Sequence, residues 1–402
     1  MSQQLELAIE FKPRVNLDII LLIMGFATRS VVARFMDTCH VLNHEGSKIL
    51  LRGPVFLQTE RQATSFVQFS QTRDASTRTL RYQLLHSLIF ALRKPSKHVA
   101  SSLQTFFADI APAIPNLKEL VLYNSEELLA GDPGIGPAVA ALTTLQKLKV
   151  TNGGAVCADT LLEMRSPLLQ AHIHVDWDPD TDDDPYWREP DLLLSPSMCA
   201  TLQTLELCGT TTFPDRPSRR IVLPQLRTLS MVHTLLPGSR ELVRSCPGLE
   251  HLHVNESNGQ KWIEVEEIRW SRLGERRMWS ALKSYSGSIN VLYMLPLSCP
   301  VTRVDVHDES SEFEAAGLRQ VLLDTTPLHF SLKTRWMGAS CYLDSDFVDT
   351  LSQPELWRSV KTLELFVCIR YADKDIILGD MLVRLRSWAF HELHKLMWLL
   401  SG

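Results

Sequence analysis

The chain has 402 residues, of which 45% are hydrophobic and 22% are charged. This balance is ordinary for a globular protein and excludes disorder along the whole chain. The formal net charge is only −5, from 41 basic and 46 acidic side chains. Such a mild imbalance gives no reason to expect a nucleic-acid partner, because phosphates favour a clustered basic face.

The lack of a recognisable targeting signal and the scattered cysteines predict an intracellular protein. No apolar run approaches the ~20 residues of a membrane-spanning helix, and residues 1–10 lack the basic and apolar regions of a signal peptide. The 8 cysteines are scattered, and no two form a C-x-x-C pair. That spacing fits neither a zinc site nor a disulfide framework. We therefore expect reduced, mostly buried thiols, a cytoplasmic or nuclear location and no membrane partner.

The first predicted elements are three helices, over residues 13–26, 29–41 and 42–51, after a tail at 1–12 that we expect to be flexible. Together they define a helical segment over 13–52. The first helix is hydrophobic almost all round, and Asp18 is the one polar residue between Leu17 and Met24. Three short helices cannot bury a helix on every side, so its excess apolar face should meet either the first unit of the following segment or another protein.

Two runs in this segment resemble the F-box family. Asp18-Ile19-Ile20 in the first helix and Thr38-Cys39-His40 at the end of the second match the family's pattern. Asn16 departs from that pattern, because the family has Pro there. Asn is a good N-cap, so the helix can still start, but the contact of that Pro with a partner would be lost.

The resemblance implies that residues 13–52 dock onto the Skp-type adaptor of an SCF ubiquitin ligase. The side chains that would face this adaptor are Val15, Leu17, Ile19, Ile20, Ile23, Met24 and Cys39. The alternative is that this apolar face only covers the first repeat of the segment described next.

A connecting segment at 53–84, expected to be helical, leads to a recurring six-residue pattern of the form apolar-x-x-apolar-x-apolar. Strong copies stand 24 residues apart from Leu202 to Leu226 and 23 residues apart from Leu226 to Leu249. These distances fall in the range of ~20–29 residues that is typical of leucine-rich repeats. The copies begin at Leu85, Leu117, Leu145, Leu202, Leu226, Leu249, Ile289, Val301 and Val360, of which the first and the last three are weaker.

The pattern predicts a short strand in each repeat, followed by a returning helix such as 235–246. A single unit cannot bury its own apolar face, whereas stacked units share a continuous core. We therefore predict an α/β fold: an irregular leucine-rich-repeat solenoid over 85–370, with a degenerate strand near 173–175 and an insertion between 249 and 289. The main alternative is an ordinary α/β domain with parallel strands and crossover helices.

Two further segments complete the chain. The acidic stretch within 176–191 lacks the turn Gly and the bidentate Glu of a calcium loop, since Thr181 and Trp187 stand there, so we expect a solvated loop. Residues 371–402 are expected to form a helix that caps the open end of the solenoid. His391 and His394 stand three residues apart, so they do not match a zinc-protease helix.

The architecture favours a binding protein over an enzyme, because no nucleotide, nucleophile or metal motif occurs. We expect neither a cofactor nor a metal. The repeats and the helical segment together are similar to F-box–leucine-rich proteins of mushroom-forming fungi, which implies a substrate-recognition subunit that binds an unknown substrate protein. The alternative is an interaction scaffold unrelated to ubiquitination.

Strand positions that alternate with the core leucines should point away from the core and form the substrate surface. His251 and His253 share one strand face, and they could bind a metal or sense pH, although surface histidines without either role are the simpler interpretation. The predicted substrate-binding residues are Glu119, Tyr123, Lys147, Lys149, Glu206, His251, His253, Asn255, Tyr293, Glu364 and Phe366.

Overall fold

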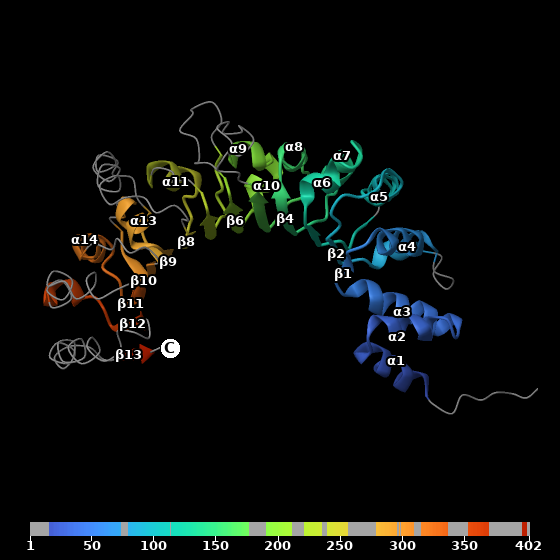
Figure 1. The fold of residues 1–402 in the computed structure, drawn as a ribbon, viewed down its shortest axis with the longest axis horizontal. Coiled ribbons are helices and arrows are strands. Elements are labelled where there is room, and N and C mark those ends of the chain that lie inside the picture. The colour runs from blue at the N-terminus through green and yellow to red at the C-terminus, as the bar shows by residue number, and fades with distance from the viewer. Residues whose placement is uncertain are drawn as a thin grey trace, which may run out of the picture.

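The computed structural model describes residues 16–73, 79–112, 114–176, 190–210, 221–234, 239–255, 279–295, 297, 299–308, 315–336, 353–369 and 396–399. Over these residues the chain is a curved α/β solenoid with a small helical unit at its N-terminal end (Figure 1). The strands line the inner, concave side of the arc, and the helices cover its outer, convex side. This is the repeat fold that the leucine spacing predicted.

The N-terminal helical unit consists of three helices, as the sequence predicted. They are α1 (Leu17–Phe26), α2 (Arg29–Met36) and α3 (His40–Arg52). The Asn16 side chain accepts a hydrogen bond of 3.0 Å from the backbone N–H of Asp18, so it caps α1. The unit has its own small core, separate from that of the solenoid, which consists of Met24, Val32, Met36 and Leu42.

The described strands form one 13-stranded parallel sheet, in which spatial order follows chain order. Each repeat therefore pairs with the repeats before and after it, as expected for a solenoid. The strands are β1 (Val55–Leu57), β2 (Ser87–Phe90), β3 (Glu119–Leu122), β4 (Lys147–Gly153), β5 (Gln170–Val175), β6 (Thr204–Cys208), β7 (Thr228–Val232), β8 (His251–Asn255), β9 (Leu282–Gly287), β10 (Val301–Asp308), β11 (His329–Trp336), β12 (Thr362–Ile369) and β13 (Leu396–Leu399).

The convex side is built from helices that connect successive strands, most of them shorter than four turns (Figure 1). The helix predicted at 235–246 is present as α11. The described helical elements of the solenoid are α4 (Glu60–Gln71), η1 (Arg81–Leu84), α5 (Lys97–Ile110), α6 (Ser125–Leu129), α7 (Ile135–Ala140), α8 (Ala155–Leu162), α9 (Pro190–Leu193), α10 (Pro196–Thr201), α11 (Ser239–Ser245), α13 (Ile289–Met294), α14 (Ala315–Thr325) and η3 (Pro354–Trp357).

A single register column runs through the sheet from β2 to β12 and holds its core together. All its members are buried, and burial of each Leu, Val or Phe among them stabilises the fold by about 1.5–3 kcal/mol relative to an exposed side chain. The strand positions predicted from the leucine pattern thus point inward. The column consists of Leu88, Leu120, Leu148, Ala171, Leu205, Leu229, Leu252, Tyr285, Val304, Phe330 and Leu363.

Two sequence predictions about the repeats were wrong. The segment 53–84 holds the helices α4 and η1 as expected, but the sheet already begins there, at β1, so the array extends N-terminally of residue 85. The apolar pattern that starts at Ile289 forms helix α13, and the strand of that repeat is β9, seven residues earlier. The cause is that Leu282 and Tyr285 carry the core of β9, where the leucine pattern is missing.

The C-terminal prediction is corrected in part. Residues 396–399 form strand β13, which pairs with β12, whereas a capping helix was expected over 371–402. The rest of that segment, the tail at 1–12 and residues 177–189 of the acidic loop lie outside the described residues. None of the helices in the described ranges combines the length and the hydropathy that a membrane span requires.

Candidate functional site

Helix α1 presents an apolar stripe to solvent. Ile19, Leu22, Ile23 and Phe26 are all exposed, Leu22 by 62% and Phe26 by 86%. Their spacing of i, i+3, i+4 and i+7 places them on one face of the helix. We call these four residues the α1 stripe. Leu17, Val31 and Val41 of the same helical unit are exposed as well, so apolar surface extends over all three helices.

The opposite side of α1 holds the unit together. Met24 is fully buried in the core with Val32, Met36 and Leu42, and Ile20 is half-buried against the same cluster. Met24 therefore does not belong to the exposed face that the sequence assigned to it. The apolar stripe is the part of α1 that packing within the unit leaves uncovered.

The structure divides the predicted adaptor-facing residues into three groups. Leu17, Ile19, Ile23 and Cys39 are exposed, Ile20 and Met24 face the core, and Val15 lies outside the described residues. Leu22 and Phe26 were missed. Their helical spacing from Ile19 was visible in the sequence, but a helix that is apolar all round gives no contrast between its two sides.

A second surface is the concave side of the sheet. The predicted substrate residues Glu119, Lys147, Lys149, Glu206, His251, His253, Asn255 and Glu364 lie on strands, at exposed or half-buried positions that alternate with the core. Phe366 is half-buried on β12, with Lys333 Nζ 5.3 Å from its ring centroid. Tyr123 directly follows β3, and Lys149 Nζ lies 5.9 Å from its ring centroid.

Tyr293 is the exception among these predictions. It lies on helix α13 and is only 8% exposed, so it cannot belong to the concave surface. The error follows from the pattern at Ile289, where a buried helix was interpreted as a strand. The half-buried positions that alternate with the core in that repeat belong to Ser284 and Ser286 on β9.

The concave surface changes character along the array. In one register row, β1 to β3 carry Phe56, Ile89 and Val121, all apolar. From β4 to β12 the same row carries charged and polar side chains, which are Lys149, His172, Glu206, Ser230, His253, Ser286, Asp305, Ser331 and Glu364. An apolar end therefore adjoins the helical unit, and a polar middle follows.

His172 on β5 and Glu206 on β6 form an ion pair on this surface, with 2.7 Å between Nδ1 and Oε2. Partial burial lowers the pKa of His172 below its usual value, and the nearby Glu206 carboxylate opposes that shift. The sequence had singled out Glu206 but not its partner, because β5 is a degenerate repeat without a leucine pattern.

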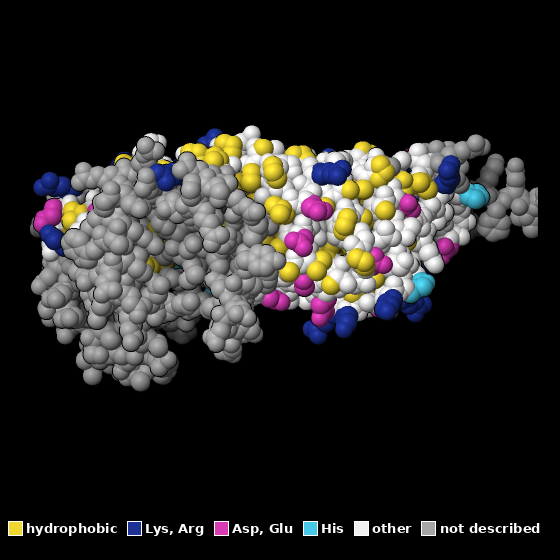
Figure 2. Space-filling view, turned by 90° about the horizontal axis from the view of Figure 1, so that it is seen from above, with side chains coloured by type: hydrophobic (Ala, Val, Ile, Leu, Met, Phe, Trp, Pro, Cys, Tyr) yellow, Lys and Arg dark blue, Asp and Glu magenta, His cyan; other side chains and the backbone are white. Residues whose placement is uncertain are grey.

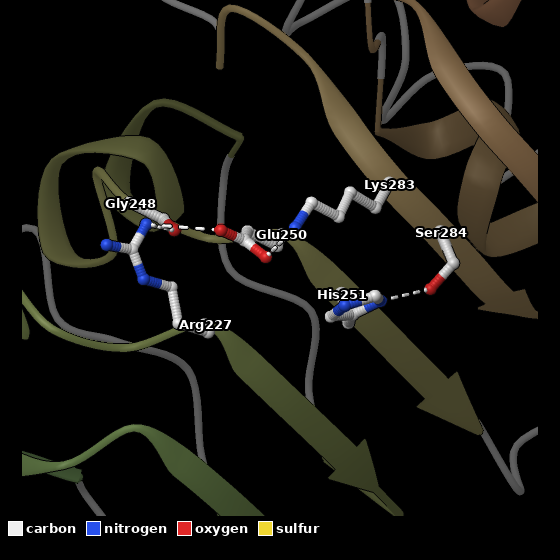
Figure 3. Close-up of polar contacts among 6 residues, drawn as sticks. All are labelled: Arg227, Gly248, Glu250, His251, Lys283 and Ser284. Carbon is white, nitrogen blue, oxygen red and sulfur yellow. Dashed lines mark hydrogen bonds and ion pairs between the residues drawn. The ribbon is translucent and has the colours of Figure 1, made fainter.

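Polar contacts cross the strands of β7 to β9 (Figure 3). Glu250 lies between Arg227 and Lys283, at 3.4 and 2.5 Å, and the hydrogen bond from Lys283 holds the pKa of this carboxyl below its usual value. His251 Nδ1 is hydrogen-bonded to Ser284 Oγ at 2.7 Å. Over the described ranges, no three His, Cys, Asp or Glu side chains are close enough to hold a metal ion together.

The convex side offers less to a partner. Where its side chains are described, apolar and charged groups are interspersed, and neither sign of charge forms a broad field (Figure 2). Burial raises the pKa of the Cys157 and Cys246 thiols to about 12, which keeps both protonated at neutral pH and unsuited to nucleophilic chemistry. The α1 stripe and the concave surface are thus the two candidate binding surfaces.

The helical unit is joined to the solenoid by a polar and aromatic junction. Arg81 Nη2 donates a hydrogen bond of 2.5 Å to Asn43 Oδ1 on α3, and its guanidinium lies 4.5 Å from the ring centroid of Phe69 on α4. Phe69 packs against the cores of both the unit and the solenoid. Arg29 adds a hydrogen bond to the carbonyl oxygen of Pro54. These contacts fix the α1 stripe relative to the sheet.

No family profile matches the chain, and no curated protein is significantly similar to it in sequence. A chain in the crystal structure of the Rad7 and Elc1 complex in yeast is similar in structure, with 14% identity and a TM-score of 0.36. The alignment covers 87% of this chain and 87% of that chain. A likeness this distant does not transfer a function or a partner.

Proposed function

We propose that this chain is a substrate-recognition subunit of an SCF-type ubiquitin ligase. The N-terminal helical unit would dock onto a Skp-type adaptor, and the concave surface would hold the protein to be modified. The chain would perform no chemistry itself, because ubiquitin would be transferred by an associated enzyme.

The observation that carries this proposal is the α1 stripe. Four large apolar side chains on one helix face are left exposed although the unit has its own core and a firm junction to the solenoid. Exposed apolar patches on a folded unit indicate a contact with another protein. The first alternative, that this face only covers the first repeat, does not fit, because the solenoid leaves these side chains open to solvent.

Two features support a Skp-type adaptor as the partner of the α1 stripe and a substrate protein as the partner of the concave surface. The segment that carries the stripe is the one whose sequence resembles an F-box. The concave surface lies on different elements from the stripe, so a docked adaptor would leave it accessible (Figure 1).

A pull-down of the full chain with a Skp-type adaptor tests this function. The wild type should be retained, whereas Leu22→Asp and Ile23→Asp should each reduce retention at least about tenfold, because a buried, unpaired charge costs several kcal/mol at an interface. Leu162→Asp is the matched control, since Leu162 is a 39% exposed leucine on the convex helix α8; this variant should bind like the wild type.

Failure of the wild type to bind the adaptor would contradict the proposal. Retention of a partner by the concave surface in the same preparation would then favour the interaction scaffold unrelated to ubiquitination.

A further inference from the structure

The middle of the concave surface is made of hydroxyl, imidazole and a few charged groups. From β7 to β11, two adjacent register rows contain no apolar side chain, in contrast to the row across β1 to β3. We call these rows the hydroxyl–imidazole strip. It consists of Thr228, Ser230, His251, His253, Ser284, Ser286, Arg303, Asp305 and His329, and it ends at Ser331, which is buried.

The carboxylates in and beside this strip already face cations. Arg303 Nε lies 2.7 Å from Asp305 Oδ2, and its Nη2 lies 3.7 Å from Glu364 Oε2. Glu250, directly before β8, is held between Arg227 and Lys283 (Figure 3). Further negative charge on a ligand would therefore not meet an uncompensated carboxylate among these three.

The charge of the strip depends on its histidines, because imidazole is the side chain that gains or loses a proton between about pH 5 and 8. His251 of the strip, and His307 just beyond the strip on β10, share hydrogen bonds with the serines of β9. His251 Nδ1 lies 2.7 Å from Ser284 Oγ, and His307 Nε2, at the end of the next strand, lies 3.3 Å from Ser286 Oγ. Each of the two serines of β9 thus shares a hydrogen bond with one imidazole, Ser284 with His251 of β8 and Ser286 with His307 of β10.

Protonation of these imidazoles changes what the serines can do. The unprotonated nitrogen of a neutral imidazole can accept a hydrogen bond from the serine hydroxyl. An imidazolium can only donate a hydrogen bond to the hydroxyl oxygen. Each serine would then have its own O–H available for an acceptor on a ligand. A ligand carboxylate would gain both an imidazolium and a hydroxyl donor at the same place, and such charge-assisted hydrogen bonds are the strong ones.

We propose that the hydroxyl–imidazole strip binds an acidic, extended segment of a partner protein, and that this binding tightens as the imidazoles take up protons. The proposal rests on the proposed function, in which the concave surface captures a protein, and it names the chemistry of what is captured. The chain as a whole carries a net charge of −5, so general electrostatic attraction would not bring an acidic segment to this surface.

Other titratable or charged groups on the strands that face His251 and His307 shape the response. Among residues whose side chains the structure describes, they are Arg227, Glu250, His253, Lys283, Arg303, Asp305, His329, Lys333 and Glu364. Their fixed charges nearly cancel, with four basic and three acidic side chains, so each proton taken up by an imidazole adds substantially to a small positive charge.

The test is fluorescence anisotropy of the full chain with a labelled peptide of alternating Glu and Gly. About eight residues suffice, since five parallel strands span ~20 Å and an extended chain covers ~3.3 Å per residue. The wild type should bind this peptide about tenfold more tightly near pH 6 than near pH 7.5, the effect of one or two charge-assisted hydrogen bonds. A peptide with Gln in place of Glu should bind weakly at both pH values.

Variants locate the effect. The double variant His251→Gln/His307→Gln should lose the gain at low pH, and Ser284→Ala/Ser286→Ala should reduce it. The matched control is His98→Gln, because His98 is an exposed histidine on the convex helix α5; this variant should keep the wild-type response.

Several results would overturn the proposal: no peptide binding, equal binding of the Gln peptide, an unchanged response in the double variant, or binding of a single-stranded oligonucleotide in place of the peptide. The adaptor pull-down is run on the same samples. Loss of peptide binding with adaptor binding intact refutes only this inference, whereas peptide binding without adaptor binding refutes only the ligase role.

Discussion

At the scale of single residues, α1 shows how one apolar helix serves two purposes. Met24 fills the core between α2 and α3, and Leu22, two positions earlier, is 62% exposed. Both residues are large and apolar, so composition alone could not separate them. Only the packing of the other two helices decides which side of α1 is covered, and for this reason the sequence assigned Met24 to the wrong face.

The two sides of α1 should therefore respond differently to truncation. Met24→Ala is expected to destabilise the helical unit by about 2–4 kcal/mol, because it removes a fully buried side chain and leaves a cavity. Leu22→Ala should change stability by less than about 0.5 kcal/mol. Denaturant unfolding followed by circular dichroism measures both, and equal losses in the two variants would show that Leu22 is a core residue.

At the scale of elements, the sequence predicted those strands that carry the leucine pattern, because the pattern is a local consequence of burying alternate residues. It failed where a repeat uses other core residues. In β9 the core positions are Leu282 and Tyr285, and the apolar run at 289–294 that follows is a buried helix. Short apolar runs fit a buried strand and a buried helix equally well, so only the tertiary structure distinguishes them.

Pairing between neighbouring strands predicts an effect of pH at β5 and β6. Burial lowers the pKa of His172 in the folded chain, so the unfolded chain binds the proton more readily. The stability that the folded chain gains from a neutral, partly buried His172 is therefore present above the ordinary histidine pKa of about 6.5. It is lost as the pH falls below that value. The loss is moderated, since the Glu206 carboxylate 2.7 Å away favours the protonated form.

His172→Gln should therefore flatten the fall in unfolding free energy between about pH 7.5 and 5.5. The measurement is urea unfolding of the wild type and this variant at both values, with His98→Gln as the control. A steeper fall in His172→Gln than in the wild type would mean that the ion pair with Glu206 outweighs burial.

At the scale of the whole molecule, the two candidate surfaces lie on parts of the chain that contact each other directly. The Arg81 junction joins the core of the helical unit to that of the solenoid through Asn43 and Phe69. A protein held on the concave surface would thus keep a defined position relative to anything docked on α1. The sequence predicted both parts of the chain, but this junction links residues 38 positions apart and follows no local pattern.

Hydrogen–deuterium exchange of the full chain with and without a Skp-type adaptor tests the central claim most directly. We predict that the adaptor slows exchange in the N-terminal helical unit, above all in α1, and leaves the concave strands β5 to β11 unchanged. Unchanged exchange in α1, or protection confined to the concave strands, would contradict the claim that the α1 stripe docks the chain onto a ligase while the sheet remains available to a captured protein.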